Sequence, residues 1–330
     1  MQNDRPLNIL INSTGRRNNL ILYFKEALGG RGKIYAGDVS SKTAGIYFAD
    51  GFIPMLPCDD PAYMDTLEEA CKKYDIQAVV SLTDNEMHVI SQNEERLSRM
   101  GVTIIGSPFK TVECCVDKLF LYRFCETNGF YAPKTYLGYD SFKVGYDKGD
   151  ISFPVYIKPR TGSASVDNVV ARSMEEVVMY CHVRQDLLIQ EYMDAQELGV
   201  DIYCDMKSDE VISVFVKDKI SMRSGETEKA VSSKHDGLVG ILEDFTRKMG
   251  LRGVVDIDLF KRDGRYYFID VNPRFGGGYP LAHRCGCDFP AYIIGNLLGQ
   301  TNEPCIGDYK EGLYMFKCEE LVFKDTTEIL

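Results

Sequence analysis

The sequence lacks several patterns that would each identify a class of protein. It has no apolar run of membrane length and no secretory leader, so we expect a cytoplasmic protein. Its 11 cysteines are scattered without paired CxxC motifs, which predicts reduced, buried thiols rather than a zinc site. The GxSxG motif and the Cys/His signature of nucleophilic hydrolases are also missing.

A dinucleotide-binding fingerprint is absent as well. The segment INSTGRRNN follows the first predicted strand and contains only Gly15 where GxGxxG would be needed. A dehydrogenase using residues 7–38, with Asp38 as the ribose acid, is therefore disfavoured.

Positive charge is scarce too. The 330 residues carry 38 Lys and Arg against 49 Asp and Glu, a formal net charge of −11. This balance argues against broad binding to nucleic acid or to an anionic membrane, but it permits a local cationic pocket. With 45% hydrophobic and 26% charged residues, the chain is typical of a globular protein of about two or three domains.

Strands alternate with helices over about the first 107 residues, which predicts an α/β domain with a parallel sheet. The expected strands are 7–13, 33–37, 78–83 and 102–106. Three helices are expected: one that ends near residue 28, one at 61–74 and one at 85–99. Ser107-Pro108 marks the exit from this domain.

After residue 108 the pattern changes to α+β with antiparallel pairing. The expected helices are 109–128, 236–249 and about 278–298. The expected strands are 154–158, 187–192, 197–206, 211–219, 252–260, 265–271 and 313–318. Residues 207–210 and the pair Asp263-Gly264 are the predicted turns of two hairpins.

The segment DGRYYFIDVNPRFGGG, residues 263–278, carries the strongest chemical signal. Asp270, Asn272 and Arg274 alternate, so they point to one side if the strand stays extended. Oxygen ligands suit Mg²⁺ and an arginine suits phosphate. The alternative is an edge strand with polar residues in water.

Further segments are consistent with this chemistry. In VVDIDLF, Asp256 and Asp258 share one strand face, and the Asp263-Gly264 turn would bring Asp258 near Asp270, where two carboxylates favour a divalent cation. In VYIKPRTGSAS, Lys158 ends a strand beside a Gly/Ser loop that can offer N–H groups and hydroxyls to phosphate, although such loops are often only loops.

The segment LLIQEYMDAQELGVDIY can form a flat purine slot beside Tyr192 and Met193, with Glu197 reaching the ribose hydroxyls. The alternative is a hairpin with exposed acids. Lys118, in VDKLFLYRF, would by itself be an ordinary solvated lysine of a helix.

In this order, Lys118, IKP with its Gly/Ser loop, QEYM with a following Glu, and DVNPR resemble the ATP-grasp superfamily. The closest resemblance is to the branch related to the large subunit of carbamoyl-phosphate synthase, and it covers nearly the whole chain. It implies a pre-ATP-grasp domain at 1–107 and a two-lobed ATP-grasp domain at 108–330. Within the latter, a lid subdomain spans about 150–195 and a C-terminal subdomain about 196–330.

The resemblance implies ATP and Mg²⁺, with Mn²⁺ as an alternative ion, and it assigns the residues that hold them. The nucleotide residues are Lys118 and Lys158 for the phosphates, Ser163 and Ser165 in the loop over them, Gln190, Glu191 and Met193 for adenine, and Glu197 for ribose. The metal residues are Asp258, Asp270 and Asn272. Arg274, with Lys158, would stabilise the transferred phosphoryl group.

The implied activity is an ATP-dependent carboxylate–amine ligase that proceeds through an acyl phosphate and acts on small molecules, with a homodimer left open. The candidate substrate residues follow predicted strands, where open α/β sheets bind ligands, and are Arg16 with its neighbours Arg17 and Asn18, Asp84, Glu86 and Arg223. Family members often carry Glu where Asp270 lies, and TGSAS is a short glycine loop.

Two alternatives remain from the sequence. One is a non-catalytic nucleotide-binding scaffold, and the other is phosphorylation of a small carboxylate such as bicarbonate. A single grasp unit argues against carbamoyl-phosphate synthesis itself.

Overall fold

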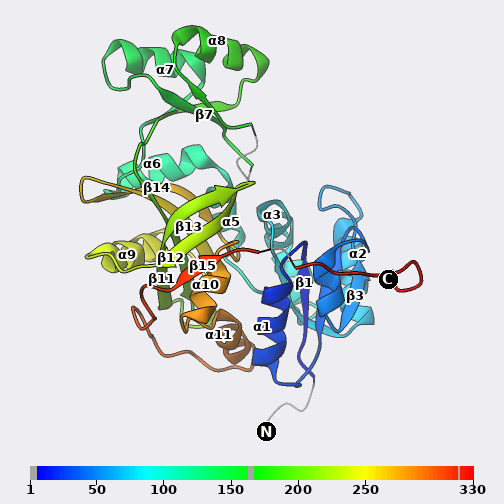
Figure 1. The fold of residues 1–330 in the computed structure, drawn as a ribbon. Coiled ribbons are helices and arrows are strands. Elements are labelled where there is room, and N and C mark those ends of the chain that lie inside the picture. The colour runs from blue at the N-terminus through cyan, green and yellow to red at the C-terminus, as the bar shows by residue number, and fades with distance from the viewer. Residues whose placement is uncertain (1–5, 163–166, 319) are drawn as a thin grey trace.

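The computed structural model describes residues 6–162, 167–318 and 320–330, and in these ranges the strands form three sheets (Figure 1). The first is a parallel sheet in the order β3-β2-β1-β4-β5, as the alternation of strands and helices predicted. Its strands are β1 Asn8–Asn12, β2 Ile34–Asp38, β3 Gly51–Pro54, β4 Ile76–Ser81 and β5 Thr103–Ile104. All five residues of β1 are buried, because helices cover both faces of a sheet of this kind.

The helices of this domain are α1 Asn18–Leu28, the 3₁₀ helix η1 Ala44–Phe48, α2 Tyr63–Lys73, α3 Asp84–Gln92 and α4 Glu94–Ser98. The single helix expected over 85–99 is therefore two helices, which meet at Asn93. The side chain of Asn93 donates to the carbonyl of Val89 at 2.9 Å, a local bond that competes with helix continuation. Strand β3 and η1 were not expected from the sequence.

The prediction of a single helix over 109–128 is also wrong, because this segment forms two helices. The structure has α5 Phe109–Val116 and α6 Lys118–Asn128, with Asp117 extended between them. The Asp117 carboxylate caps α6 by accepting from the N–H groups of Leu119 and Phe120. This break places Lys118 in the first turn of α6 instead of in the middle of a helix.

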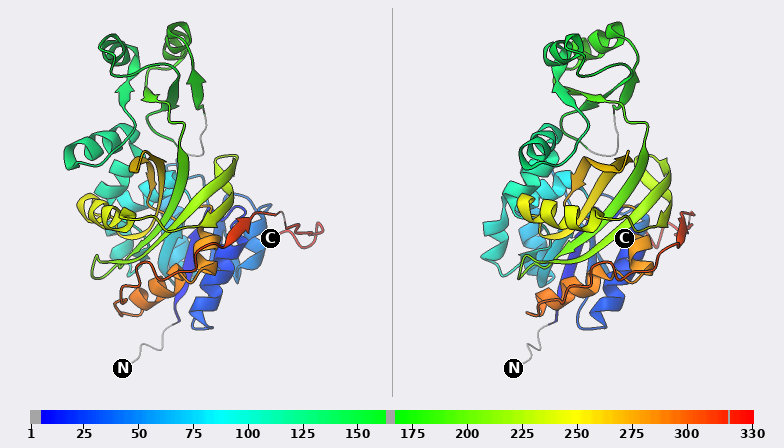
Figure 2. Two further views of the ribbon diagram at one scale, coloured as in Figure 1. Left: turned by 60° about the vertical axis from the view of Figure 1, so that its left-hand side comes forward. Right: turned by 90° about the vertical axis from the view of Figure 1, so that its left-hand side faces the viewer.

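The second sheet belongs to a small subdomain that stands apart from the rest of the molecule (Figures 1 and 2). Its order is β6-β9-β7-β8, with antiparallel pairs. Its elements are β6 Thr135–Leu137, α7 Gly138–Asp147, β7 Val155–Pro159, β8 Val169–Ala171, α8 Met174–Val183 and β9 Leu187–Glu191. Helices α7 and α8 lie on the far side of this sheet, and β6 and α7 precede the stretch assigned to the lid from the sequence. The domain bounds stay a prediction.

The third and largest sheet has the order β14-β13-β10-β11-β12-β15 and is antiparallel throughout. Its strands are β10 Gln196–Cys204, β11 Val211–Arg223, β12 Glu226–Ser232, β13 Gly253–Arg262, β14 Arg265–Asn272 and β15 Tyr314–Phe316. The accompanying helices are α9 Leu238–Met249, α10 Tyr279–Arg284 and α11 Phe289–Leu297. Both predicted hairpins are confirmed, and Asp263 and Gly264 have the positive φ values of 52° and 73° that a type I′ turn needs.

The two faces of this sheet differ in chemistry because side chains alternate along each strand. On one face, Val200, Ile257 and their neighbours pack in an apolar core with residues of α6 and α9. On the other face, acids and lysines of β10, β11, β13 and β14 turn toward the other two sheets. The candidate site is built on this polar face. No helix in the described part of the chain has the length and apolar character needed to span a membrane.

Candidate functional site

A cavity of about 900 Å³ opens where the three sheets meet. Its wall includes residues from the loop after β4, from α6, from β7 and β9 of the small subdomain, and from β10 to β14. Most of the predicted site residues line it, namely Asp84, Lys118, Lys158, Gln190, Glu191, Met193, Glu197, Asp258, Asp270, Asn272 and Arg274. A cavity of this size suits a nucleotide with a second small molecule.

The residues predicted to form a purine slot lie at the end of β9 and just after it. Tyr192 and Met193 both line the cavity, with Met193 buried and Tyr192 41% exposed. Gln190 is buried and donates from Nε2 to Oγ1 of Thr135 at 2.7 Å. The Glu191 carboxylate accepts from Arg262 at 2.7 Å, so its side chain is already held by a protein partner.

Two lysines from different elements approach one another in the middle of the cavity. Nζ of Lys118 donates to the carbonyl of Gly162 at 2.7 Å and lies 3.4 Å from Oδ1 of Asp270. Lys158 is 3% exposed, and burial lowers its pKa to about 8, with the charge of Lys118 acting in the same direction and that of Asp270 opposing it. Two cations of this kind are suited to phosphate oxygens. The predicted loop residues Ser163 and Ser165 lie outside the described residues.

The carboxylates meet across β13 and β14, near one another as predicted, and a register shift between Asp258 and Leu259 sets their exact pairing. Asp258 lies opposite Asp270, and Asp256 lies opposite Asn272. Nδ2 of Asn272 donates to Oδ2 of Asp256 at 3.3 Å. Burial raises the pKa of Asp258 to about 6, with Asp256 and a further acid, Glu197, adding to the rise against the effect of Lys219.

Lys219, a residue that the sequence analysis missed, links two of the predicted site acids. Its Nζ lies 2.6 Å from Oδ1 of Asp258 and 2.8 Å from Oε1 of Glu197. The side chain is 4% exposed. The available signal was the spacing of Lys217 and Lys219 in an otherwise apolar strand, since two lysines on one face of a buried strand need acidic partners.

The donor set fits a magnesium ion that is held jointly with phosphate. Among the residues that the structure describes, no group of three His, Cys, Asp or Glu side chains can hold a metal unaided. Mg²⁺ in nucleotide sites is usually held by one or two carboxylates together with phosphate oxygens. Asp258 and Asp270, with Asn272 beside them, supply such oxygens, and burial, with the charges of Asp256 and Glu197, raises the pKa of Asp258, which a divalent cation would offset.

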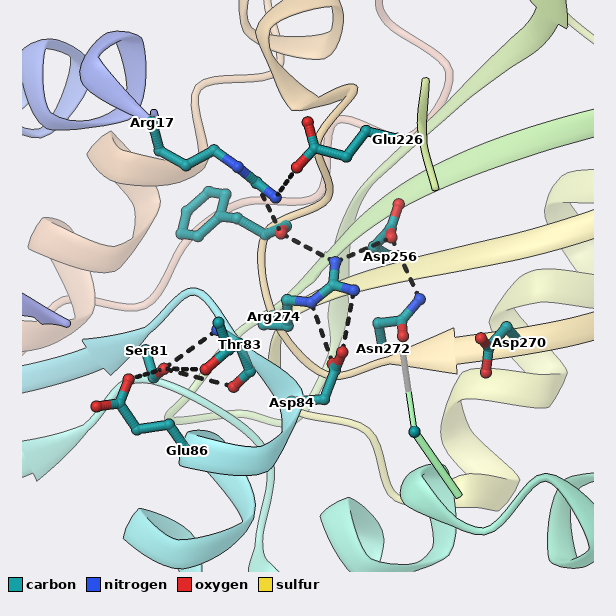
Figure 3. A network of polar contacts seen from close by, with 12 residues as sticks. Arg17, Ser81, Thr83, Asp84, Glu86, Glu226, Asp256, Asp270, Asn272 and Arg274 are labelled. Atoms are coloured by element: carbon teal, nitrogen blue, oxygen red, sulfur yellow. Dashed lines mark hydrogen bonds and ion pairs between the residues drawn. The ribbon is translucent and has the colours of Figure 1, made fainter. Parts of the chain in front are cut away.

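Arg274 is held firmly by its surroundings (Figure 3). It pairs with Asp84 through two nitrogens at 3.1 Å, and NH1 donates to Asp256 at 3.2 Å and to the carbonyl of Phe275 at 3.1 Å. These contacts use most of the five N–H groups of a guanidinium. Burial alone would lower the pKa of Arg274, but Asp84 and Asp256 raise it. Asp84, at the start of α3 in the parallel-sheet domain, thus fixes an arginine that follows β14 of the antiparallel sheet.

The glycine run after Arg274 is explained by charged side chains that pack against it. A Cβ on Gly276 would lie 2.3 Å from Oδ1 of Asp256, and a Cβ on Gly278 would lie 2.6 Å from Cε of Lys217. These distances are too short for non-bonded atoms, so any side chain here would displace the cavity wall. Glycine is required for close approach rather than for an unusual backbone angle.

The remaining predicted substrate residues, apart from Arg17, do not line the cavity. Arg16 is exposed, whereas its neighbour Arg17 lines the cavity. Glu86 is buried, accepts from Ser13 and Tyr63 at 2.7 Å, and also from Ser81, so its role is to hold the ends of β1 and β4.

Arg223 has the same outcome for a different reason. The segment read as a loop is the hairpin of β11 and β12, and Arg223 at its tip is 67% exposed with Glu228 at 3.8 Å. The residues of this hairpin that line the cavity are Met222, Ser224, Gly225, Glu226 and Thr227.

Comparison with known families gives two matches. The family described as "PylC-like, N-terminal domain" matches residues 9–105, and the family described as "ATP-grasp domain" matches residues 115–278. The arginine-specific carbamoyl phosphate synthase large chain of Bacillus subtilis is 20% identical over 203 residues, 58% of this chain and 20% of its own length. The carbamoyl phosphate synthase large chain of Methanosarcina barkeri is 24% identical over 242 residues, 65% of this chain and 22% of its own. The chain thus spans about a fifth of these relatives.

Solved structures share the fold over nearly the whole chain. The biotin carboxylase domain of Hydrogenobacter thermophilus 2-oxoglutarate carboxylase, crystallised with MgADP, ADP and bicarbonate, has a TM-score of 0.74 at 17% identity, covering 93% of this chain and 73% of that one. The L-amino acid ligase of Bacillus licheniformis has a TM-score of 0.69 at 19% identity, covering 90% and 75%. N5-carboxyaminoimidazole synthetase of Staphylococcus aureus, complexed with ADP, has a TM-score of 0.72 at 14% identity, covering 92% and 80%. The predicted combination of a parallel-sheet domain with a two-lobed antiparallel part is confirmed.

Proposed function

Because the chain belongs to the ATP-grasp superfamily, in the branch related to the carbamoyl phosphate synthase large chain, we propose that it is an ATP- and Mg²⁺-dependent carboxylate–amine ligase. Members of the family are ATP-dependent C–N ligases, and ATP with Mg²⁺ are their usual cofactors. The observation that carries the proposal is one cavity that joins an apolar slot, two lysines, a carboxylate pair and a fixed arginine.

In the proposed binding mode, adenine lies against Tyr192 and Met193, and Glu197 reaches the ribose. Lys118 and Lys158 contact the phosphates. Asp258, Asp270 and Asn272 would hold Mg²⁺ beside them, and the ion would neutralise phosphate charge during transfer. The support is that all these side chains line the same cavity.

The proposed reaction has two steps. An oxygen of the substrate carboxylate attacks the γ-phosphorus of ATP, the bond to the β-phosphate oxygen breaks, and ADP leaves. The nitrogen of the amine then attacks the acyl carbon, phosphate leaves with the C–O electron pair, and the nitrogen loses a proton. The protein contributes by positioning the reactants and by offering charge through Lys118, Lys158 and Arg274.

Arg274 is suited to the transferred group because its geometry is set before any ligand arrives. Asp84 and Asp256 hold the guanidinium plane, so little reorganisation is needed when negative charge develops beside it. Its two acidic partners also neutralise it, which disfavours tight ground-state binding of an anion at this residue. We therefore assign Arg274 to the transition state rather than to ATP affinity.

The test is ADP formation with Mg²⁺ and ATP in the presence of pooled small carboxylates and pooled amines, added singly and together. A requirement for both pools, abolished by EDTA, is the expected result. ADP formation stimulated by bicarbonate alone would favour carboxylate phosphorylation, and ATP binding with no ADP under any condition would favour a non-catalytic scaffold.

A further inference from the structure

Beyond Arg274 the cavity ends at a second guanidinium, that of Arg17. Arg17 lies in the loop between β1 and α1 and lines the cavity. Its NH2 lies 2.9 Å from Oε1 of Glu226, and its NH1 lies 3.4 Å from the carbonyl oxygen of Phe275. The same carbonyl accepts from Arg274, so a single oxygen separates the two guanidinium groups (Figure 3).

The two arginines differ in the net charge around them: acids outnumber the cation at Arg274, whereas cations outnumber the acid at Arg17. Arg274 has two carboxylates, Asp84 and Asp256. Arg17 has one, Glu226, and shares it with Lys317, whose Nζ lies 3.0 Å from Oε2. The cluster of Arg17, Glu226 and Lys317 therefore carries one formal positive charge in excess.

The pKa shifts of the three side chains agree with this excess of positive charge. Burial lowers the pKa of Arg17 although Glu226 opposes the shift, and burial likewise lowers the pKa of Lys317. Burial would raise the pKa of Glu226, but Arg17 and Lys317 hold it at about 2. Both cations are thus incompletely compensated by the one acid between them.

We propose that Arg17 binds an anionic group on a substrate other than the carboxylate that is activated, and that Glu226 is a resident counter-ion that yields Arg17 to this group. The inference rests on the proposed ligase function and specifies its substrates: one of them carries an additional carboxylate. That substrate is either a dicarboxylate donor or an amine with its own carboxylate, such as an amino acid.

Glu226 can yield without being left unpaired. Its two oxygens are divided, Oε1 on Arg17 and Oε2 on Lys317, so the bond to Lys317 survives when Arg17 takes a new partner. Lys317 follows β15 and is not part of the cavity wall among the described residues. Gly277 leaves the space for this acid, since a Cβ there would lie 3.1 Å from Cδ of Glu226.

Arg17 also has donors to spare. A guanidinium offers five N–H groups, and the contacts to Glu226 and to the Phe275 carbonyl use only part of them. The carbonyl contact is long at 3.4 Å and easily exchanged. Arg17 can therefore bind a carboxylate, donating two N–H groups to it in the fork geometry that arginine favours.

The experiment compares anionic probes with their neutral carboxamides in the presence of Mg²⁺ and a non-hydrolysable ATP analogue. The probes are short-chain dicarboxylates and the common amino acids, and binding is measured by saturation-transfer NMR and competition. The variants are Arg17→Met, Arg17→Lys and Glu226→Gln, and the matched control is Arg31→Met, an exposed arginine of the same domain.

The expected result is that the wild type and the control bind an anionic probe about tenfold or more tightly than its amide, as a charge-assisted hydrogen bond would give. Arg17→Met should lose this preference while keeping the same affinity for the ATP analogue, and Arg17→Lys should restore part of it. Glu226→Gln should bind the anionic probe more tightly than the wild type, which a merely structural acid would not do. Whether the dicarboxylates or the amino acids show the preference identifies the source of the anion.

Several outcomes would overturn the inference. They are failure of the wild type to bind any anionic probe, an unchanged acid preference in Arg17→Met, and weaker anion binding in Glu226→Gln. ADP formation measured in parallel separates the two levels. Probe binding without any ADP formation refutes the ligase and leaves the subsite, whereas turnover with equal use of acid and amide refutes the subsite and leaves the ligase.

Discussion

Lys158 offers the most quantitative test of the nucleotide site, because its burial lowers its pKa to about 8. A lysine must be protonated to attract phosphate, and between pH 7.5 and 9 the protonated fraction of such a group falls from about three-quarters to about one-tenth. Bound phosphates favour the charged form and raise the pKa. The affinity for Mg-ATP should therefore fall about eightfold over this interval, and ATP binding at pH 8 should take up about half a proton.

The assay is isothermal titration calorimetry in buffers of different ionisation enthalpy, which reports the number of protons exchanged on binding. Lys158→Met removes the titrating group and should bind ATP weakly with no proton uptake in this range. Lys158→Arg is the matched control, because it keeps the positive charge and should bind without a pH dependence.

Two results would refute this reasoning. One is ATP binding by the wild type with no proton uptake near pH 8, and the other is equal uptake by Lys158→Met. Either would mean that Lys158 does not face the phosphates.

A proton release below about pH 6 is a separate expectation, because Mg²⁺ binding should deprotonate Asp258, whose pKa is raised to about 6.

Further predictions concern the acid pair, the arginine and the glycine run. Asp270→Asn should abolish Mg²⁺-dependent ADP formation while the circular dichroism spectrum stays unchanged, and full activity would remove the metal assignment. Arg274→Ala should keep the ATP affinity measured by calorimetry but lower kcat by about a hundredfold to a thousandfold; a collapse of ATP affinity would place the residue in ground-state binding instead. Gly276→Ala should lower kcat because its Cβ would lie 2.3 Å from Oδ1 of Asp256, which orients Arg274. The control is Gly264→Ala, at a turn that has space for a Cβ but a φ of 73°, so this variant should lose stability and keep its kcat. Equal losses of kcat in the two variants would refute the packing argument.

The nucleotide and metal ends of the site could be predicted because their geometry is local. Asp270 and Asn272 alternate on β14, and the Asp263-Gly264 turn pairs this strand with β13, with a register shift between Asp258 and Leu259. A period of two and a turn type are properties of a few neighbouring residues. The sequence alone therefore placed Asp258 near Asp270, and the register shift then set the two directly opposite each other.

The helix break at Asp117 shows where local patterns become ambiguous. Apolar periodicity continues through 109–128, yet Asp117 caps α6 and pairs with Arg160 of the small subdomain at 2.9 Å from Nε. An acid in a periodic segment is compatible with a helix interior or a cap. The ion pair with Arg160 decided in favour of the cap, and the cap in turn decided the placement of Lys118.

The substrate end was decided by tertiary structure alone. Nothing in the local sequence distinguishes Arg16 from Arg17 or Glu86 from Asp84. Arg17 meets Glu226 and Asp84 meets Arg274 across separations of about 200 residues. Ion pairs between elements depend on how the sheets pack, so the sequence determined the fold and the strand segments that carry the charged residues, while packing selected which of these residues line the cavity.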